Sequence, residues 1–164
     1  EGGKIMKAAI VIHSLTGNTL SVGNGIKRNL EEKGLETELI KIEPIGGENK
    51  NEADITKINF QDHLNVEEYD FVIIGSPVRG FSMSPVLKAY LNKAGELHEK
   101  KFYIFVTHFF PFAFMGGKNA IRQIRSQIES NGGSVVDTAI IDWKNPSRTK
   151  QIDKLIQNWS HRIQ

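Results

Sequence analysis

Short apolar runs of strand length alternate with segments of helical periodicity along this chain. The runs are Lys7–His13, Glu36–Ile42, Tyr69–Gly75, Lys101–Thr107 and Val135–Trp143. Apolar residues at helical spacing lie in Asn18–Lys33, in the segment that begins at Ser84-Pro85, in Ile121–Ile128 and in Ile152–Ile163. Strands that alternate with helices build a parallel sheet that is covered on both faces. The sequence therefore predicts an α/β three-layer sandwich with five parallel strands in the order 2-1-3-4-5.

The remaining segments set the expected domain limits. Glu43–Glu68 contains a proline, two glycines and many polar residues, which indicates a long surface loop with a short helix near Asp62–Val66. Residues 1–5 precede Met6 and are expected to be an expression remnant or a disordered N-terminus. Because no internal repeat or second domain is visible, residues 6–164 are predicted to form one domain.

Composition excludes several classes of function. The 164 residues include no cysteine, which removes disulfides, iron–sulfur clusters, thiolate zinc sites and cysteine nucleophiles. The 21 basic and 19 acidic residues leave a net charge of +2, which makes no case for nucleic acid as a partner. The apolar runs are too short to cross a bilayer and no signal peptide is visible, so we expect a cytoplasmic protein without a membrane partner. The histidines lack metal-ligand spacing, and no metal site is expected.

The loop after the first predicted strand has the composition of a phosphate site. Residues 13–19 read His-Ser-Leu-Thr-Gly-Asn-Thr, with three hydroxyls and no Lys or Arg, and they lead into a predicted helix. The unpaired amides and the positive dipole end of a helix N-terminus bind anions without basic side chains. A helix cap alone needs one hydroxyl. We therefore expect a phosphate to be bound by the side chains of Ser14, Thr16 and Thr19 and the amides of Leu15, Thr16, Gly17, Asn18 and Thr19.

Two further loops of unusual composition follow the third and fourth strands. One runs Ser76-Pro77-Val78-Arg79-Gly80-Phe81, and the other runs from His108 to Gly117 with Phe109, Phe110, Phe112 and Phe114 within six positions. Ligands of such sheets bind beyond the carboxyl ends of the strands, at the point where the strand order reverses. The loops after strands one, three and four meet there, so the sequence predicts that all three belong to one ligand site.

These residues carry a resemblance to a known family. Ser14-Leu15-Thr16-Gly17-Asn18-Thr19 matches the pattern Thr/Ser-x-Thr-Gly-x-Thr of the FMN phosphate loop in the flavodoxin family. Gly75-Ser76-Pro77, leading into Met83-Ser84-Pro85, resembles the flavin-flanking loop of the same superfamily, especially in its NAD(P)H-dependent oxidoreductase and flavodoxin branches. The resemblance covers the chain from Met6 onward and implies a flavodoxin-like fold with FMN as cofactor.

The resemblance also implies which residues surround the flavin. They are Ser76, Pro77, Val78, Arg79, Gly80 and Phe81 from the second loop, with Thr107, His108, Phe109, Gly116 and Gly117 from the third. A cation at the flavin N1–O2 edge stabilises the reduced form, so Arg79 is a candidate catalytic residue, against the alternative of a solvated surface arginine. His108 is the other candidate catalytic residue, which would contact the flavin or relay a proton, unless its role is structural.

The aromatic residues leave several interpretations open. Phe109, Phe110, Phe112 and Phe114 could wall the flavin, bind an apolar substrate ring, form a homodimer interface or fill an edge of the core. Trp143 and Trp159 are most simply core or interface residues. His13 borders the phosphate loop, where a structural role is favoured.

Other proteins that handle phosphate on similar folds do not fit. A response-regulator receiver needs acidic residues where His13-Ser14 and Gly75-Ser76 stand, and a low-molecular-weight phosphatase needs a cysteine. A Walker loop needs Gly-Lys-Ser/Thr, which Gly117-Lys118-Asn119 breaks. A serine hydrolase needs Gly-x-Ser-x-Gly, which Gly75-Ser76-Pro77 does not match.

Two functions of different classes remain, and a third is less favoured. The first is an FMN-dependent oxidoreductase that takes hydride from NAD(P)H and reduces a quinone-like or other small acceptor. The second is an electron-transfer carrier that docks redox proteins, and the third is a flavin-free interaction domain. Flavodoxin carriers are typically strongly acidic, which steers them to basic partners. Because the pI of this chain is about 8.8, the oxidoreductase is favoured.

Overall fold

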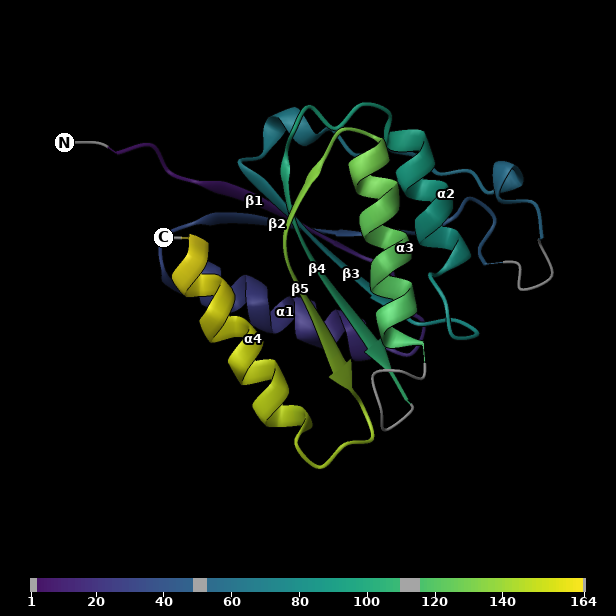
Figure 1. Cartoon of the computed structure of the whole chain (residues 1–164). Coiled ribbons are helices and arrows are strands. Elements are labelled where there is room, and N and C mark those ends of the chain that lie inside the picture. Colours follow the sequence, from purple (N-terminus) through teal and green to yellow (C-terminus); the bar gives the residue numbers. More distant parts are fainter. Residues whose placement is uncertain (1–2, 49–52, 110–115, 164) are drawn as a thin grey trace.

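A five-stranded parallel sheet forms the centre of the molecule (Figure 1). The computed structural model describes residues 3–48, 53–109 and 116–163. The strands are β1 (Lys7–Ile12), β2 (Glu36–Lys41), β3 (Phe71–Pro77), β4 (Lys101–His108) and β5 (Ser134–Asp142). Their order is β2-β1-β3-β4-β5 and each neighbouring pair is parallel, which confirms the predicted flavodoxin-like topology.

Four helices in the described residues cover the two faces of the sheet (Figure 1). α1 (Asn18–Glu32) and α4 (Arg148–Ile163) pack on one face, and α2 (Pro85–Ala94) and α3 (Gly117–Ser130) pack on the other. Each layer buries its own apolar cluster, and burying one large apolar side chain contributes about 1.5–3 kcal/mol. Within the described part of the chain, no helix combines the length and apolar character needed to span a bilayer.

The connection from β2 to β3 differs from its prediction. In its described residues, a first 3-10 turn spans Ile55–Lys57 and a second spans Val66–Glu68, so the short helix predicted near Asp62–Val66 is a single 3-10 turn that begins only at Val66. The Asn65 side chain accepts a hydrogen bond from the Glu67 amide and so starts the second turn at Val66. Leu64 and Val66 are buried in the cluster beneath α2, which anchors a segment whose composition is mostly polar.

β3 and β4 extend beyond the apolar runs at their carboxyl ends. β3 includes Ser76 and Pro77, and β4 includes His108, because backbone pairing with the neighbouring strand continues through these residues. Gly75 is needed for close packing, since a Cβ at this position would lie 2.3 Å from a ring carbon of Phe105. Small and polar residues therefore form the edge of the sheet at which the strands end.

Candidate functional site

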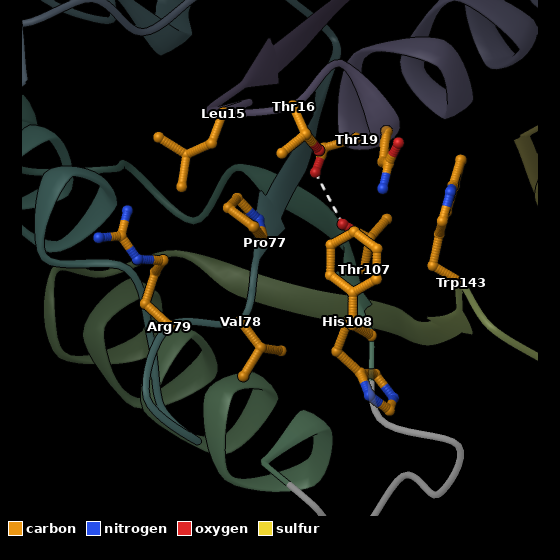
Figure 2. A pocket seen from close by; sticks show the side chains of 11 residues that line it. Leu15, Thr16, Thr19, Pro77, Val78, Arg79, Thr107, His108 and Trp143 are labelled. Atoms are coloured by element: carbon orange, nitrogen blue, oxygen red, sulfur yellow. Dashed lines mark hydrogen bonds between the residues drawn. The ribbon is translucent and has the colours of Figure 1, made fainter.

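A cavity of about 170 Å³ lies at the carboxyl edge of the sheet (Figure 2). Four connections supply its lining, namely Leu15, Thr16, Asn18 and Thr19 after β1, Pro77, Val78 and Arg79 at the end of β3, Thr107, His108 and Phe109 at the end of β4, and Trp143 after β5. Figure 2 shows these side chains converging from loops that are far apart in the sequence. The structure thus brings together described residues from each of the three loops that the sequence singled out.

The first loop is organised by Ser14. Its hydroxyl oxygen accepts hydrogen bonds from the amides of Gly17 and Leu20, at 3.2 and 3.3 Å. Gly17 has a φ of +91°, a left-handed conformation that glycine adopts without steric cost, and α1 begins at the next residue. The first amides of a helix have no acceptor within the helix, and no acidic residue stands in the first turn of α1. The geometry is suited to an anion.

Thr19 has a partner inside the protein. Its hydroxyl lies 2.8 Å from that of Thr107 on β4, and both side chains are buried (dashed line in Figure 2). Of the three hydroxyls expected to bind phosphate, those of Ser14 and Thr19 therefore take part in internal hydrogen bonds. Thr16 is exposed and lines the cavity, so its hydroxyl is the one best placed to contact a ligand.

The second loop turns away from the cavity after Arg79. The backbones of Arg79 and Ser82 exchange two hydrogen bonds of 2.9 Å, which makes Gly80 and Phe81 the tip of a tight turn. Phe81 has a φ of +63°, and its carbonyl accepts a hydrogen bond of 3.0 Å from the Asn119 side chain at the start of α3. Pro77, Val78 and Arg79 line the cavity, whereas Gly80 and Phe81 do not.

Five other predicted site residues also lie outside the lining of the cavity, namely Ser14 and Gly17 of the first loop, and Ser76, Gly116 and Gly117. Ser76 is fully buried, and its hydroxyl donates to the carbonyl of Pro77. Gly116 lies against Phe81, because a Cβ on Gly116 would stand 2.5 Å from the Phe81 Cα. Gly117 lies beside His108, whose Cδ2 would be 3.5 Å from an added Cβ. Phe110, Phe112 and Phe114 lie outside the described residues.

Arg79 is paired with an acid that the sequence did not single out. Its Nη1 lies 3.2 Å from Oε1 of Glu48, and the same oxygen lies 3.5 Å from Nε2 of His13. Nδ1 of His13 is 2.7 Å from the Ser84 hydroxyl, in a buried contact. Burial lowers the pKa of His13, the charge of Glu48 raises it, and the charge of Arg79 lowers it further. Arg79 lines the cavity as part of this cluster, and its predicted contact with the flavin stays a prediction.

His108 forms a buried pair with Asp142 at the end of β5. Its Nε2 lies 2.5 Å from Oδ1 of Asp142. Neither atom has a hydrogen-bond partner among the described residues, so this contact is an ion-pair contact whose alignment does not meet hydrogen-bond geometry. Asp142 is held by Gln151, which donates to Oδ2 at 3.2 Å and accepts from the Asp142 amide at 2.8 Å. Nδ1 of His108 is buried and has no partner among the described residues.

Trp143 is a cavity residue that sequence reasoning placed in the core or an interface. It follows β5 directly, and its amide donates to the carbonyl of His108 at 2.8 Å. The Arg148 guanidinium stacks 4.6 Å from its ring centroid and donates to its carbonyl, which holds Trp143 in place. The missed signal was its position at the carboxyl end of a strand, whereas Trp159 is a core residue as expected.

Comparisons with known proteins agree with this fold and identify the family. The family model of the NADPH-dependent FMN reductases matches residues 6–144. Oxidised flavodoxin 2 from Bacillus cereus superimposes with a TM-score of 0.67 at 17% identity, covering 95% of this chain and 99% of that one. A flavoprotein in complex with FMN from Lactobacillus acidophilus NCFM gives 0.63 at 19% identity, covering 91% and 97%. These likenesses show the fold. The search of curated sequences gives no match.

Proposed function

The chain belongs to the NADPH-dependent FMN reductase family, and from this premise we propose that it is an FMN-dependent oxidoreductase that takes hydride from NAD(P)H and reduces a small quinone-like acceptor. The observation that carries the proposal is the convergence of the predicted loops on one cavity at the switch point of the sheet. Both the phosphate-binding features and the apolar wall that a flavin needs are supplied by the described residues around it.

The described residues fit the two chemically different parts of FMN. The start of α1 presents its first backbone amides, of which that of Leu20 donates to Ser14, and the exposed Thr16 hydroxyl to a phosphate. Pro77, Val78, Phe109 and Trp143 give the cavity an apolar lining that suits a planar aromatic ring. A cavity with one polar end and one apolar wall favours FMN over free phosphate or an apolar ligand alone.

FMN supplies the hydride- and electron-accepting chemistry when it is bound. The apolar residues of the cavity would orient the ring and exclude water. His108 lines the cavity, and Oδ1 of Asp142, 2.5 Å from its Nε2, holds the ring in place. We propose His108 as the residue that relays a proton during turnover, with Asp142 as its positioning residue.

An electron-transfer carrier is the second candidate, and one observation favours it. Leu15 and Phe109 line the cavity, yet they are 41% and 47% exposed, so these two side chains form an exposed apolar rim. Such a rim could dock a redox protein as well as an apolar acceptor. The net charge of +2 argues against the electrostatic steering that acidic carriers use, which leaves the oxidoreductase as the better-supported function.

Titration with FMN followed by steady-state kinetics tests the proposal. We expect flavin absorbance to accompany the purified or FMN-titrated protein, and turnover with NADH or NADPH when a benzoquinone is present. No turnover with either nucleotide, together with rapid reduction by a partner reductase, would support the carrier. A protein that binds no FMN would refute both functions.

A further inference from the structure

Glu48 joins two loops of the site through a single carboxylate oxygen. Its Oε1 lies 3.2 Å from Nη1 of Arg79, which follows β3, and 3.5 Å from Nε2 of His13, which follows β1. The Glu48 and Arg79 side chains are 24% and 31% exposed, whereas that of His13 is 3% exposed. The carboxylate is therefore held between one buried partner and one partner that lines the cavity.

The buried partner is fixed by α2. The Ser84 hydroxyl caps this helix by accepting from the Leu87 amide, and its oxygen lies 2.7 Å from Nδ1 of His13. The hydroxyl proton is free to be donated to Nδ1, so the neutral imidazole carries its own proton on Nε2. That proton faces Glu48. A neutral His13 can thus anchor the carboxylate without cancelling its charge.

We propose that Glu48 is a positioning residue that holds Arg79 at the wall of the cavity and sets how much of its positive charge acts on the flavin, with His13 as the anchor of Glu48. This inference rests on the proposed binding of FMN in the cavity. Reduction adds negative charge to a flavin, and an uncompensated guanidinium nearby stabilises that charge. A carboxylate at contact distance offsets most of the field of Arg79, so Glu48 keeps the reduction potential lower than Arg79 alone would set it.

The cluster itself can be tested in the protein without flavin. The NMR titration of the His13 ring, assigned with a His13→Gln variant, reports the charges beside it. Glu48→Gln should lower the pKa of His13 because an anion that favours the imidazolium is removed, and Arg79→Gln should raise it because a cation is removed. Glu31→Gln is the matched control, since Glu31 pairs with Lys27 on the exposed side of α1. If Glu48→Gln and Arg79→Gln both titrate like the control, the cluster is refuted.

The effect on the flavin is tested by redox titration of the FMN-loaded proteins. Glu48→Gln should strengthen the binding of reduced FMN about tenfold relative to oxidised FMN, which is a rise of about 30 mV for a two-electron couple. Glu48→Asp should restore part of the wild-type potential, and it replaces Glu48→Gln if the latter fails to fold. In an Arg79→Gln background, the Glu48→Gln shift should shrink, since Glu48 acts through Arg79.

These experiments distinguish a failure of the proposed FMN binding from a failure of the proposed role of Glu48. If the wild-type protein binds no FMN, the proposed function fails and this inference fails with it. If FMN binds but Glu48→Gln and Glu31→Gln have equal potentials, the inference alone is overturned. An undiminished Glu48→Gln shift without Arg79 would likewise overturn it, because Glu48 would then act on the flavin directly.

Discussion

The hydroxyl oxygens of Thr19 and Thr107 lie 2.8 Å apart, although 88 residues separate the two threonines along the chain. Both side chains are buried, one at the start of α1 and the other near the end of β4. Their hydrogen bond ties the first loop to the strand that leads into the third loop. It therefore sets the relative position of two walls of the cavity before any ligand is bound.

Thr19→Val and Thr107→Val should each lower the free energy of unfolding by about 1–3 kcal/mol, because each leaves the other hydroxyl buried without its partner. The double variant should be less destabilised than the sum of the two single variants, since no unpaired hydroxyl remains. Urea unfolding of the four flavin-free proteins measures this cycle. Strictly additive effects would contradict a direct bond between the two side chains.

The strands and the loops of the site were predictable from local pattern. Apolar runs and helical spacing follow from which faces are buried, and polar or glycine-rich segments at strand ends mark the switch-point loops. Trp143 carried only the weaker signal of its position after a strand, and Glu48 was not predictable in this way. Trp143 is a single aromatic residue after a strand, and Glu48 belongs to an irregular polar segment in which no periodicity marks a fixed position.

The hydrogen-bond partner of the Thr19 side chain was also not predictable from the sequence. Composition shows that three hydroxyls stand in the first loop, but it does not show which of them point inward. That depends on how α1 packs beside β4, which brings Thr107 to within hydrogen-bond distance. The Thr19 hydroxyl bonds inside the protein, whereas Thr16 is exposed at the cavity, and the phosphate contacts of both stay predictions.

Asp142→Asn should lower kcat for reduction of a benzoquinone by about 100-fold while leaving the Kd for FMN near its wild-type value. The neutral amide no longer pairs with the His108 ring, so the ring loses the charged partner that positions it for proton transfer. Steady-state kinetics and FMN titration measure the two quantities. Asp153→Asn, on the exposed side of α4, is the control. Equal losses in FMN affinity and in kcat would indicate a structural pair instead.

Trp143→Phe should remove the larger part of the fluorescence quenching that FMN binding produces. Trp143 lines the cavity, whereas Trp159 is buried in the layer of α1 and α4 at 2% exposure. A flavin in the cavity would therefore lie much closer to the first indole. Tryptophan emission is recorded during FMN titration of the wild-type, Trp143→Phe and Trp159→Phe proteins. Quenching that survives in Trp143→Phe but not in Trp159→Phe would place the flavin elsewhere.

His13 should make the free energy of unfolding depend on pH on the acidic side of neutrality. Burial lowers the pKa of His13 in the folded protein, whereas in the unfolded chain it takes up a proton near pH 6.5. The unfolded state therefore binds more protons between the two pKa values, and stability falls as pH drops below about 6.5. Urea midpoints measured from pH 7.5 downward in wild type and His13→Gln test this. A slope that is unchanged in the variant would contradict it, with the exposed His161→Gln as control.

A substitution in the first loop should affect binding of the FMN phosphate and leave binding of the flavin ring unchanged. Thr16→Val should weaken FMN binding about 10- to 100-fold, because a hydrogen bond to a charged group contributes about 1.5–3 kcal/mol. Thr16 is exposed at the cavity, so the substitution should leave the free energy of unfolding nearly unchanged. Riboflavin, which carries the same ring without the phosphate, should bind the variant and the wild-type protein equally.

The ratio of the FMN affinity to the riboflavin affinity shows which part of the flavin the first loop contacts. If Thr16 and the first amides of α1 bind the phosphate, the preference for FMN over riboflavin falls in the variant, and added salt weakens FMN binding more than riboflavin binding. If both flavins lose affinity equally, the loop contacts the ring and the orientation of the cofactor is reversed. Isothermal titration of both flavins against both proteins distinguishes these cases. The reversed orientation would also separate Arg79 from the ring, and the role of Glu48 would then have to be abandoned.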